Sequence, residues 1–225
     1  MISHYDQGQY HGTRLSFLEK RKVLWNVLWK YHFSRLIESS FHVLELGAAH
    51  CDFINAVECR QRTAVDRWDG VQEHAAVGVT PWTRDVTDLS FLDDHSVDFA
   101  FASNLFEHLS QNDFIVCLGQ LRAKLRPRGI LAIVQPNFKY AYREYFDDYT
   151  HVTIYTEKGL SDLLEANGFA VEECRGRFLP FSLNSWWPVL PCLIRLYLWL
   201  PFKPFAKQMF IRARVKQSAA GAQKV

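Results

Sequence analysis

The stretch that most constrains the fold runs from Phe41 to Asp66, FHVLELGAAHCDFINAVECRQRTAVD. An apolar run leads into Gly47, a loop of small residues follows, and a helical run and a short strand then end at Asp66. Strand, tight turn, helix, strand and acid form the opening unit of a nucleotide-binding α/β sheet. Asp66 lies nineteen residues after Gly47, and a carboxylate at the end of a second strand can accept hydrogen bonds from both hydroxyls of a ribose.

The glycines of this turn bear on which nucleotide it binds. A dinucleotide calls for G-x-G-x-x-G, because the backbone must come close to a pyrophosphate. Only Gly47 is present, and Ala49 and Cys51 stand where a side chain would crowd a phosphate. A nucleoside without a phosphate, such as S-adenosylmethionine, tolerates these side chains better. A nicotinamide-dependent oxidoreductase is therefore the weaker interpretation, although Asp66 fits either nucleotide.

Length and composition fit one α/β domain. A chain of 225 residues can bury about 70% of its unfolded surface. The net charge of +2, without a basic stripe, does not indicate nucleic acid. Five cysteines without a C-x-x-C pair argue for a reducing compartment and against both a disulfide framework and a zinc site. The polar N-terminus lacks the apolar core of a secretory signal, so we expect a cytoplasmic protein.

Further strings follow the first unit in a set order. The first string begins at Glu45 and reads E-L-G-x-x-x-x-D/E-F, and the second begins at Asp98 and reads D-x-x-x-A-S-N-x-x-E-H-L. The third begins at Leu125 and reads L-R-P-x-G, which predicts a turn. Across residues 41–215 these motifs resemble class I S-adenosylmethionine-dependent methyltransferases. The narrower resemblance is to bacterial members that accompany polysaccharide or glycolipid assembly. It depends on the segments RKVLWNVLWKY, FASNLFEHL, VQPN, FDDYTH and RFLPFS followed by IRLYLWLP.

The resemblance implies a fold and a cofactor site. The fold is α/β, a doubly wound, seven-stranded and mostly parallel sheet whose last strand is antiparallel. The cofactor is S-adenosyl-L-methionine, and the product is S-adenosyl-L-homocysteine. The implied cofactor-binding residues are Glu45, Gly47, Ala49, Asp66, Arg67, Asp85, Val86, Asn104 and Leu105. Among them Asp85 would accept from the adenine amino group beside the Val86 backbone, and the backbone after the fourth strand would face the methionine part.

The resemblance also bears on two residues that follow the fourth strand. In this family the Glu-His pair, here Glu107 and His108, usually caps or braces the next helix. A structural role for His108 is therefore favoured over a role as catalytic base.

The stretch Phe138–Thr156 holds five tyrosines and follows the fifth strand. It therefore lies at the carboxyl edge of the sheet, where we expect the pocket for the methyl acceptor. Asp147 and His151 are four residues apart and would share one face of a helix, so that Asp147 orients His151 as a base. In the alternative, which has equal weight, Asp147 caps a turn or forms a local salt bridge and His151 packs at the mouth of the pocket. Asp147, Asp148 and His151 could also bind a metal, but the sequence offers no further cluster of ligands beside them, so no metal is predicted.

The apolar segments suggest how the domain is covered. We expect one domain over residues 1–215, with a helical cover over 1–40, an apolar lid over 178–206 and a disordered tail over 216–225. The cover contains a basic amphipathic helix, Arg14–Glu38, which should pack on the sheet rather than on a membrane. Prolines interrupt residues 186–202, so this stretch fits a lid or a peripheral contact with the inner face of the membrane, and not a membrane span.

The sequence thus predicts transfer of a methyl group by direct displacement to a hydroxyl of a sugar, glycolipid or small molecule. The alternative is a methyltransferase-like binding or scaffold protein at a membrane surface, which has lost turnover together with the glycines. Saturable binding of S-adenosylmethionine distinguishes the two. The oligomeric state is not predicted.

Overall fold

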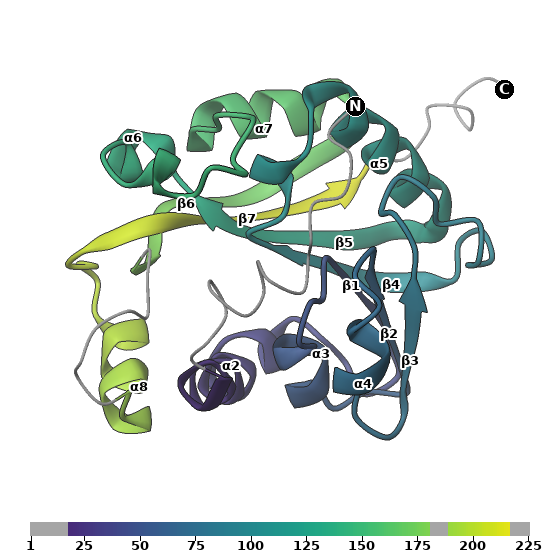
Figure 1. The fold of residues 1–225 in the computed structure, drawn as a ribbon, viewed down its shortest axis with the longest axis horizontal. Helices are drawn as coiled ribbons and strands as arrows, with labels where there is room; N and C mark the ends of the chain where they lie inside the picture. Colours follow the sequence, from purple (N-terminus) through teal and green to yellow (C-terminus); the bar gives the residue numbers. More distant parts are fainter. Residues whose placement is uncertain (1–17, 181–188, 217–225) are drawn as a thin grey trace, which may run out of the picture.

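The computed structural model describes residues 18–180 and 189–216. These residues form a seven-stranded sheet in the order β3-β2-β1-β4-β5-β7-β6 (Figure 1). The strands are β1 (His42–Leu46), β2 (Gln61–Asp66), β3 (Val79–Thr83), β4 (Val97–Ser103), β5 (Leu125–Pro136), β6 (Phe169–Pro180) and β7 (Ala206–Val215). Strands β1 to β5 are parallel, and β7 is antiparallel to both β5 and β6. The predicted fold class is confirmed.

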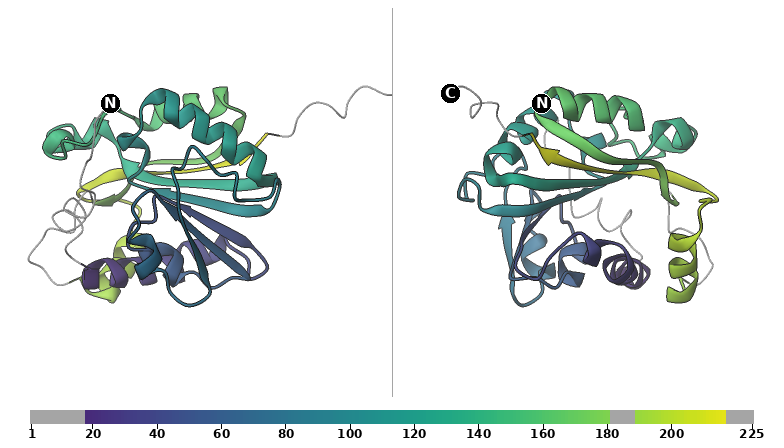
Figure 2. Two further views of the ribbon diagram at one scale, coloured as in Figure 1. Left: turned by 45° about the vertical axis from the view of Figure 1, so that its right-hand side comes forward. Right: turned by 180° about the vertical axis from the view of Figure 1, so that it is seen from behind.

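Helices cover both faces of the sheet. They are α2 (Leu18–Tyr31), η1 (Phe33–Arg35), α3 (Asp52–Ala56), α4 (Val71–His74), η2 (Phe106–His108), α5 (Gln111–Lys124), α6 (Phe138–Ala141), η3 (Tyr145–Asp147), α7 (Glu157–Ala166) and α8 (Pro191–Trp199). Helices α2, α3 and α4 lie on one face, and α5 and α7 lie on the other (Figures 1 and 2). All five residues of β1 are buried, as expected of a parallel strand covered on both sides.

The strand order places a crevice at one edge of the sheet. Strand β1 lies between β2 and β4, so the connections that leave the carboxyl ends of β1 and β4 turn to opposite faces (Figure 1). Ligands of open α/β sheets bind at such a switch point. The loops that begin at Gly47 and Asn104 both start there.

The predicted helix Arg14–Glu38 is shorter in the structure. Helix α2 buries Trp25 and Leu28 against the sheet as predicted, but it ends at Tyr31. After it, Phe33 is fully buried and its ring lies 5.1 Å from the rings of both Phe53 and Phe101. The chain leaves the helix because this packing stabilises Phe33 in the core more than a further helical turn would.

The predicted turn at Leu125–Gly129 is wrong. Strand β5 already begins at Leu125, which pairs with Val97. The extra residues are absorbed by a register shift between Val97 and Phe99, where Arg128 takes a left-handed φ of 66°. Between these two pairs β4 has one residue and β5 has four, so the bulge keeps the strand continuous while three extra residues leave the ladder.

The segment predicted as a lid, 178–206, begins and ends in the sheet. Phe178 and Leu179 are buried at the end of β6, and Ala206 opens β7. Between them α8 buries none of its side chains. Among the described residues no helix has the length and apolar character needed to cross a bilayer. Residues 1–17, 181–188 and 217–225, which include most of the predicted tail, lie outside the described residues.

Candidate functional site

The turn after β1 is built from left-handed backbone. Gly47 has a φ of 63°, and a Cβ placed there would lie 2.8 Å from Leu105 Cδ1, so a side chain at this position would be strained and would displace Leu105. Ala49 and Cys51 also adopt positive φ values, of 45° and 57°. Both therefore take the backbone conformation that glycine would favour, at a cost of about 1–2 kcal/mol each. The turn keeps this shape although alanine and cysteine stand at these two positions.

Asp66 is bonded directly to this turn. Its Oδ2 accepts a hydrogen bond from the Ala49 N–H at 2.8 Å, and its Oδ1 accepts one from the Trp68 N–H at 2.8 Å. Burial raises the pKa of the carboxyl, and hydrogen bonds from backbone N–H groups oppose that shift. A carboxylate offers about four acceptor positions, so the two bonds leave capacity for a ribose. The turn and the acid lie together, as the sequence predicted.

Glu45 and Arg67 flank these residues differently. The Glu45 carboxylate is buried and accepts a hydrogen bond from the Ile54 N–H at 3.0 Å. Desolvation raises its pKa well above the usual value. Glu45 thus braces the first turn of α3, and its contact with a cofactor stays a prediction. Arg67 is exposed next to Asp66.

The predicted adenine residues follow β3. Asp85 is exposed, and its Oδ1 accepts hydrogen bonds from the backbone N–H and the hydroxyl of Thr87, at 2.9 and 2.7 Å. Val86 is buried beside it. This turn fixes the direction of the Asp85 carboxylate at the edge of the sheet.

The loop after β4 touches the loop after β1. Asn104 has a left-handed φ of 49°, its N–H donates to Val134 O, and its Oδ1 accepts from Gln208 Nε2, both at 2.8 Å. Leu105 follows and covers Gly47. The two loops therefore form one continuous edge across β1 and β4.

Glu107 and His108 were predicted to cap or brace the helix that follows them, and the structure shows that they do not cap it. The N-cap of α5 is Ser110, whose Oγ accepts from the Asp113 N–H at 3.1 Å. The Glu107 carboxyl is fully buried, and neither of its oxygens has a hydrogen-bond partner among the described residues. Burial raises its pKa to about 8 and lowers the pKa of His108 to about 4.

The helical face predicted for Asp147 and His151 is wrong. Tyr145–Asp147 forms a single 3-10 turn, and the chain from His151 to Thr156 has no helix. Asp147 is exposed, whereas His151 is buried. The ring of His151 lies 4.8 Å from that of His108 and 4.6 Å from that of Tyr145. The structure therefore brings His151 to the residues after β4.

Comparison with known proteins settles the family. A family model described as a methyltransferase domain matches residues 18–174. The chain belongs to this family. No curated protein matches the sequence.

Three solved structures similar to this methyltransferase domain are each 20% identical to it or less, so they show the fold. A SAM-dependent methyltransferase from Archaeoglobus fulgidus is 20% identical, with 86% of this chain and 94% of that chain covered and a TM-score of 0.62. A second similar structure is one chain of the complex between the Haloferax volcanii Trm112 methyltransferase activator and a methyltransferase. It is 14% identical, with 96% of this chain and 100% of that chain covered and a TM-score of 0.71. The Burkholderia thailandensis 1,6-didemethyltoxoflavin-N1-methyltransferase, with bound S-adenosylhomocysteine, is 17% identical. The match covers 93% of this chain and 85% of that chain, with a TM-score of 0.60.

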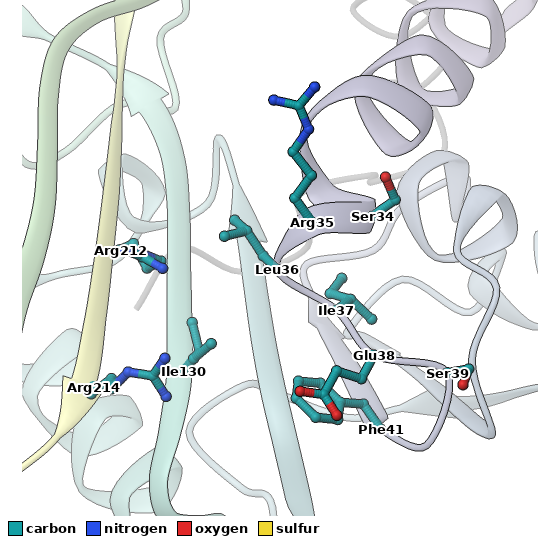
Figure 3. A pocket seen from close by; sticks show the side chains of 10 residues that line it. All are labelled: Ser34, Arg35, Leu36, Ile37, Glu38, Ser39, Phe41, Ile130, Arg212 and Arg214. Carbon is teal, nitrogen blue, oxygen red and sulfur yellow. The ribbon is translucent and has the colours of Figure 1, made fainter.

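A pocket of the methyltransferase domain lies away from this edge (Figure 3). It is lined by Ser34, Arg35, Leu36, Ile37, Glu38, Ser39, Phe41, Ile130, Arg212 and Arg214. Phe41 precedes β1, and Ile130 lies early in β5. The pocket thus sits toward the amino ends of the parallel strands, opposite Gly47 and Asp66, and it is separate from the candidate site.

Sequence reasoning missed that Glu107 and His108 lie close to His151. The Glu-His pair after β4 was visible in the sequence, but His151 lies more than forty residues further along the chain. Residue spacing alone could not bring them together.

Proposed function

We propose that this chain is an S-adenosylmethionine-dependent methyltransferase that acts on a hydroxyl of a sugar, glycolipid or small-molecule acceptor. The observation that carries the proposal is the bonded contact between the Gly47 turn and Asp66 at the switch point of the sheet. The names of the similar A. fulgidus and B. thailandensis structures support the choice of cofactor. The hydroxyl acceptor follows from the resemblance in sequence and from the tyrosine-rich edge after β5.

The residues present fit such a cofactor. The unused acceptor positions of Asp66 would hold the ribose, and the glycine at position 47 would let the backbone of the turn come close to the cofactor. Asp85 and Val86 would meet the adenine. Ala49, Arg67, Asn104 and Leu105 would line the rest of the site, while Glu45 would support the turn from behind.

The bound cofactor supplies an electrophilic methyl group on a sulfonium that leaves readily. The remaining task of the protein is to align an acceptor oxygen behind that methyl group. Alignment of this kind can lower a barrier by about 7–11 kcal/mol. Because the loops after β1 and β4 touch, both reactants would be held on one rigid edge.

Calorimetric titration tests the cofactor. We expect the wild-type protein to bind S-adenosylmethionine with saturable heat below millimolar concentration. Asp66→Ala should weaken binding about 10- to 150-fold, since a hydrogen bond to a charged group contributes roughly 1.5–3 kcal/mol. Asp69→Ala removes a neighbouring exposed acid and should bind like the wild type. If the wild-type protein gives no saturable heat, the scaffold alternative is favoured.

We further propose that the acceptor hydroxyl is activated at His151. A neutral imidazole within reach of a hydroxyl acts as a base and contributes about 10²- to 10⁴-fold. With a fractionated envelope extract and methyl-labelled cofactor, His151→Ala should lose transfer by that factor and keep its affinity for the cofactor. Asp147→Ala tests the proposed orienting role of Asp147, since full transfer by this variant would remove that role.

The surface of α8 supports a peripheral contact with a membrane. Its exposed apolar side chains include Leu193 and Trp199, and Phe202 and Phe205 follow it. The one charged residue of the helix, Arg195, lies over the ring of Tyr31 at 5.0 Å. A helix with an unpaired apolar face can lie in the interface of a bilayer.

Vesicle co-sedimentation tests this contact. Leu193→Glu combined with Trp199→Glu should abolish binding to vesicles that contain anionic lipid, because a charge opposes insertion of an apolar face. Val77→Glu, at a fully exposed apolar position in the β2–β3 connection, is the matched control and should bind normally. Equal sedimentation of all three proteins would contradict the proposal.

A further inference from the structure

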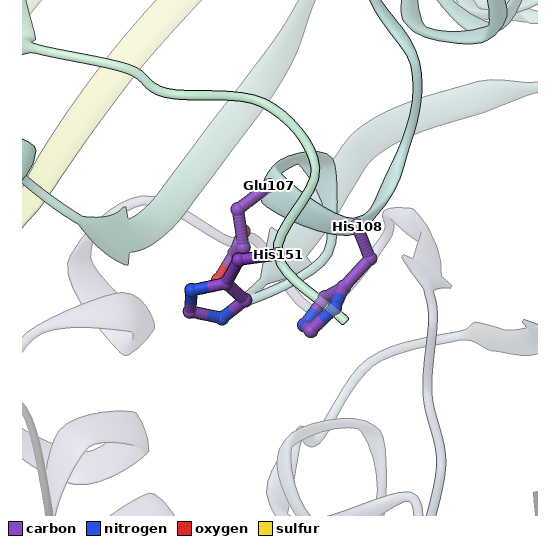
Figure 4. Close-up of side chains that lie close together, drawn as sticks. All are labelled: Glu107, His108 and His151. Carbon is purple, nitrogen blue, oxygen red and sulfur yellow. The ribbon is translucent and has the colours of Figure 1, made fainter. Parts of the chain in front are cut away.

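We propose that Glu107, His108 and His151 form a binding site for one divalent transition-metal ion. Each residue offers one ligand atom, and these atoms all lie within 4.8 Å of one another. The three side chains converge from two separate segments, η2 and the irregular chain after η3 (Figure 4). Two imidazoles and one carboxylate are a ligand set that suits Zn²⁺ and Fe²⁺ and leaves coordination positions open.

The state of Glu107 is the first argument. Its side chain is 0% exposed, and among the described residues neither carboxyl oxygen accepts or donates a hydrogen bond. A buried polar group without a partner costs free energy, and a buried carboxylate costs more. The carboxyl group points toward the ring of His151 (Figure 4). A cation between them would supply the missing partner.

The second argument is which of the two ring nitrogens of His108 carries the proton. The hydroxyl of Thr150 donates to Asp148 Oδ1 at 2.6 Å and lies 2.9 Å from His108 Nδ1. Since that hydroxyl has one proton and gives it to Asp148, it accepts from His108. The ring proton is therefore on Nδ1, and the lone pair is on Nε2. A ligating histidine is typically held in this way, by a donor bond from its other nitrogen to a neighbouring oxygen.

Backbone bonds hold the third ligand in place. The carbonyl oxygen of Glu107 accepts hydrogen bonds from the N–H groups of Val152 and Thr153, at 2.9 and 3.1 Å. His151 is thereby fastened next to Glu107 although 44 positions separate them. Donors bound to Zn²⁺ at about 2.0–2.2 Å lie roughly 3.3 Å apart. Small side-chain rotations would therefore close the site around the ion.

The site deepens the proposed function, and its catalytic role rests on that function. Glu107 lies two residues after Leu105, which covers Gly47, so the ion would sit beside the cofactor edge. A divalent ion lowers the pKa of an oxygen that it binds. The acceptor hydroxyl would lose its proton to water, its oxygen lone pair would form the O–C bond, and the C–S bond would break with its electron pair on sulfur. In the ion-bound protein His151 would act as a ligand, and the base role proposed above would apply to the protein without the ion.

Direct metal binding tests the site without an acceptor or cofactor. We expect the metal-depleted wild-type protein to bind one equivalent of Zn²⁺ by calorimetry, and one equivalent of Co²⁺ with a visible absorption band. Glu107→Gln keeps the side-chain shape, and His151→Ala removes a ring. Each should weaken Zn²⁺ binding by more than about tenfold. Zn²⁺ should also raise the melting temperature of the wild type and not that of the variants.

His95→Asn is the matched control, because His95 is exposed and Asn tolerates its left-handed φ of 53°. It should bind Zn²⁺ like the wild type. If Glu107→Gln does not fold, His151→Ala alone decides the matter. Wild-type protein that binds no Zn²⁺ at millimolar concentration, or a His151→Ala variant that binds it unchanged, overturns the proposal. Failure of S-adenosylmethionine binding would instead overturn the proposed function and leave the metal titration readable.

Discussion

Gly47→Val is expected to weaken the binding of S-adenosylmethionine about 100-fold, or ~2.7 kcal/mol. A residue with a side chain at the φ of 63° found here is strained by about 1–2 kcal/mol, and a β-branched residue by more. The new Cβ would also meet Leu105 Cδ1 at 2.8 Å. Leu105 would have to move off the turn, and both proposed contacts with the cofactor would change at once. Calorimetric titration of the folded variant measures the effect.

Gly119→Ala is the control for this substitution. Gly119 lies in α5, and a Cβ added there meets nothing within 4 Å. Alanine favours the helix by about 0.5–1 kcal/mol over glycine, so this variant should melt slightly higher and bind the cofactor normally. A Gly47→Val protein that melts like the wild type and also binds like it would show that the turn is not the cofactor site.

Phe101→Ala is expected to lower the free energy of unfolding by about 3–5 kcal/mol. Phe101 lies in β4 at the centre of the sheet and is fully buried. Its ring centroid lies 4.0 Å from that of Phe53, 5.1 Å from that of Phe33 and 5.5 Å from that of Trp25. The substitution would leave a cavity where α2 and α3 pack on the sheet, and packed neighbours relax into such a cavity only in part.

Urea denaturation measures this loss. If only stability differs, the slope of the free energy of unfolding against urea concentration is unchanged. The melting temperature should fall by roughly 6–20 °C, at about 2–4 °C per kcal/mol for a chain of this size. Phe202→Ala is the matched control, because Phe202 is 69% exposed. Its stability should stay within about 0.5 kcal/mol of the wild type. Comparable losses in both variants would mean that packing around Phe101 does not carry the stability.

Local patterns predicted the parts of the fold that depend on local physics. The uninterrupted apolar run of β4 marked a buried parallel strand, and the alternation of Gln208–Val215 marked the last, antiparallel strand. The small-residue turn with an acid nineteen residues later located Gly47 and Asp66. These predictions succeeded because side-chain period and turn chemistry are properties of short segments.

Predictions that needed a neighbour from elsewhere in the chain were less accurate. The pattern of α2 continued past Tyr31, but Phe33 packs on Phe53 and Phe101 instead. Asp147 and His151 had helical spacing, yet the backbone of Glu107 holds the chain after His151 in an extended form. In both cases long-range contacts overrode a local preference, which is weak in free energy.

The sequence by itself determined that this chain forms a doubly wound sheet with a glycine turn after one strand and an acid after the next, because hydrophobic period, glycine and the acid at a strand end act over short distances. Only the tertiary structure decided that Ala49 and Cys51 keep the glycine-like turn, and that Glu107, His108 and His151 meet. The strained backbone at Ala49 is held by the hydrogen bond that its N–H donates to Asp66. The second arrangement depends on two hydrogen bonds between segments more than forty residues apart, and no local pattern encodes them.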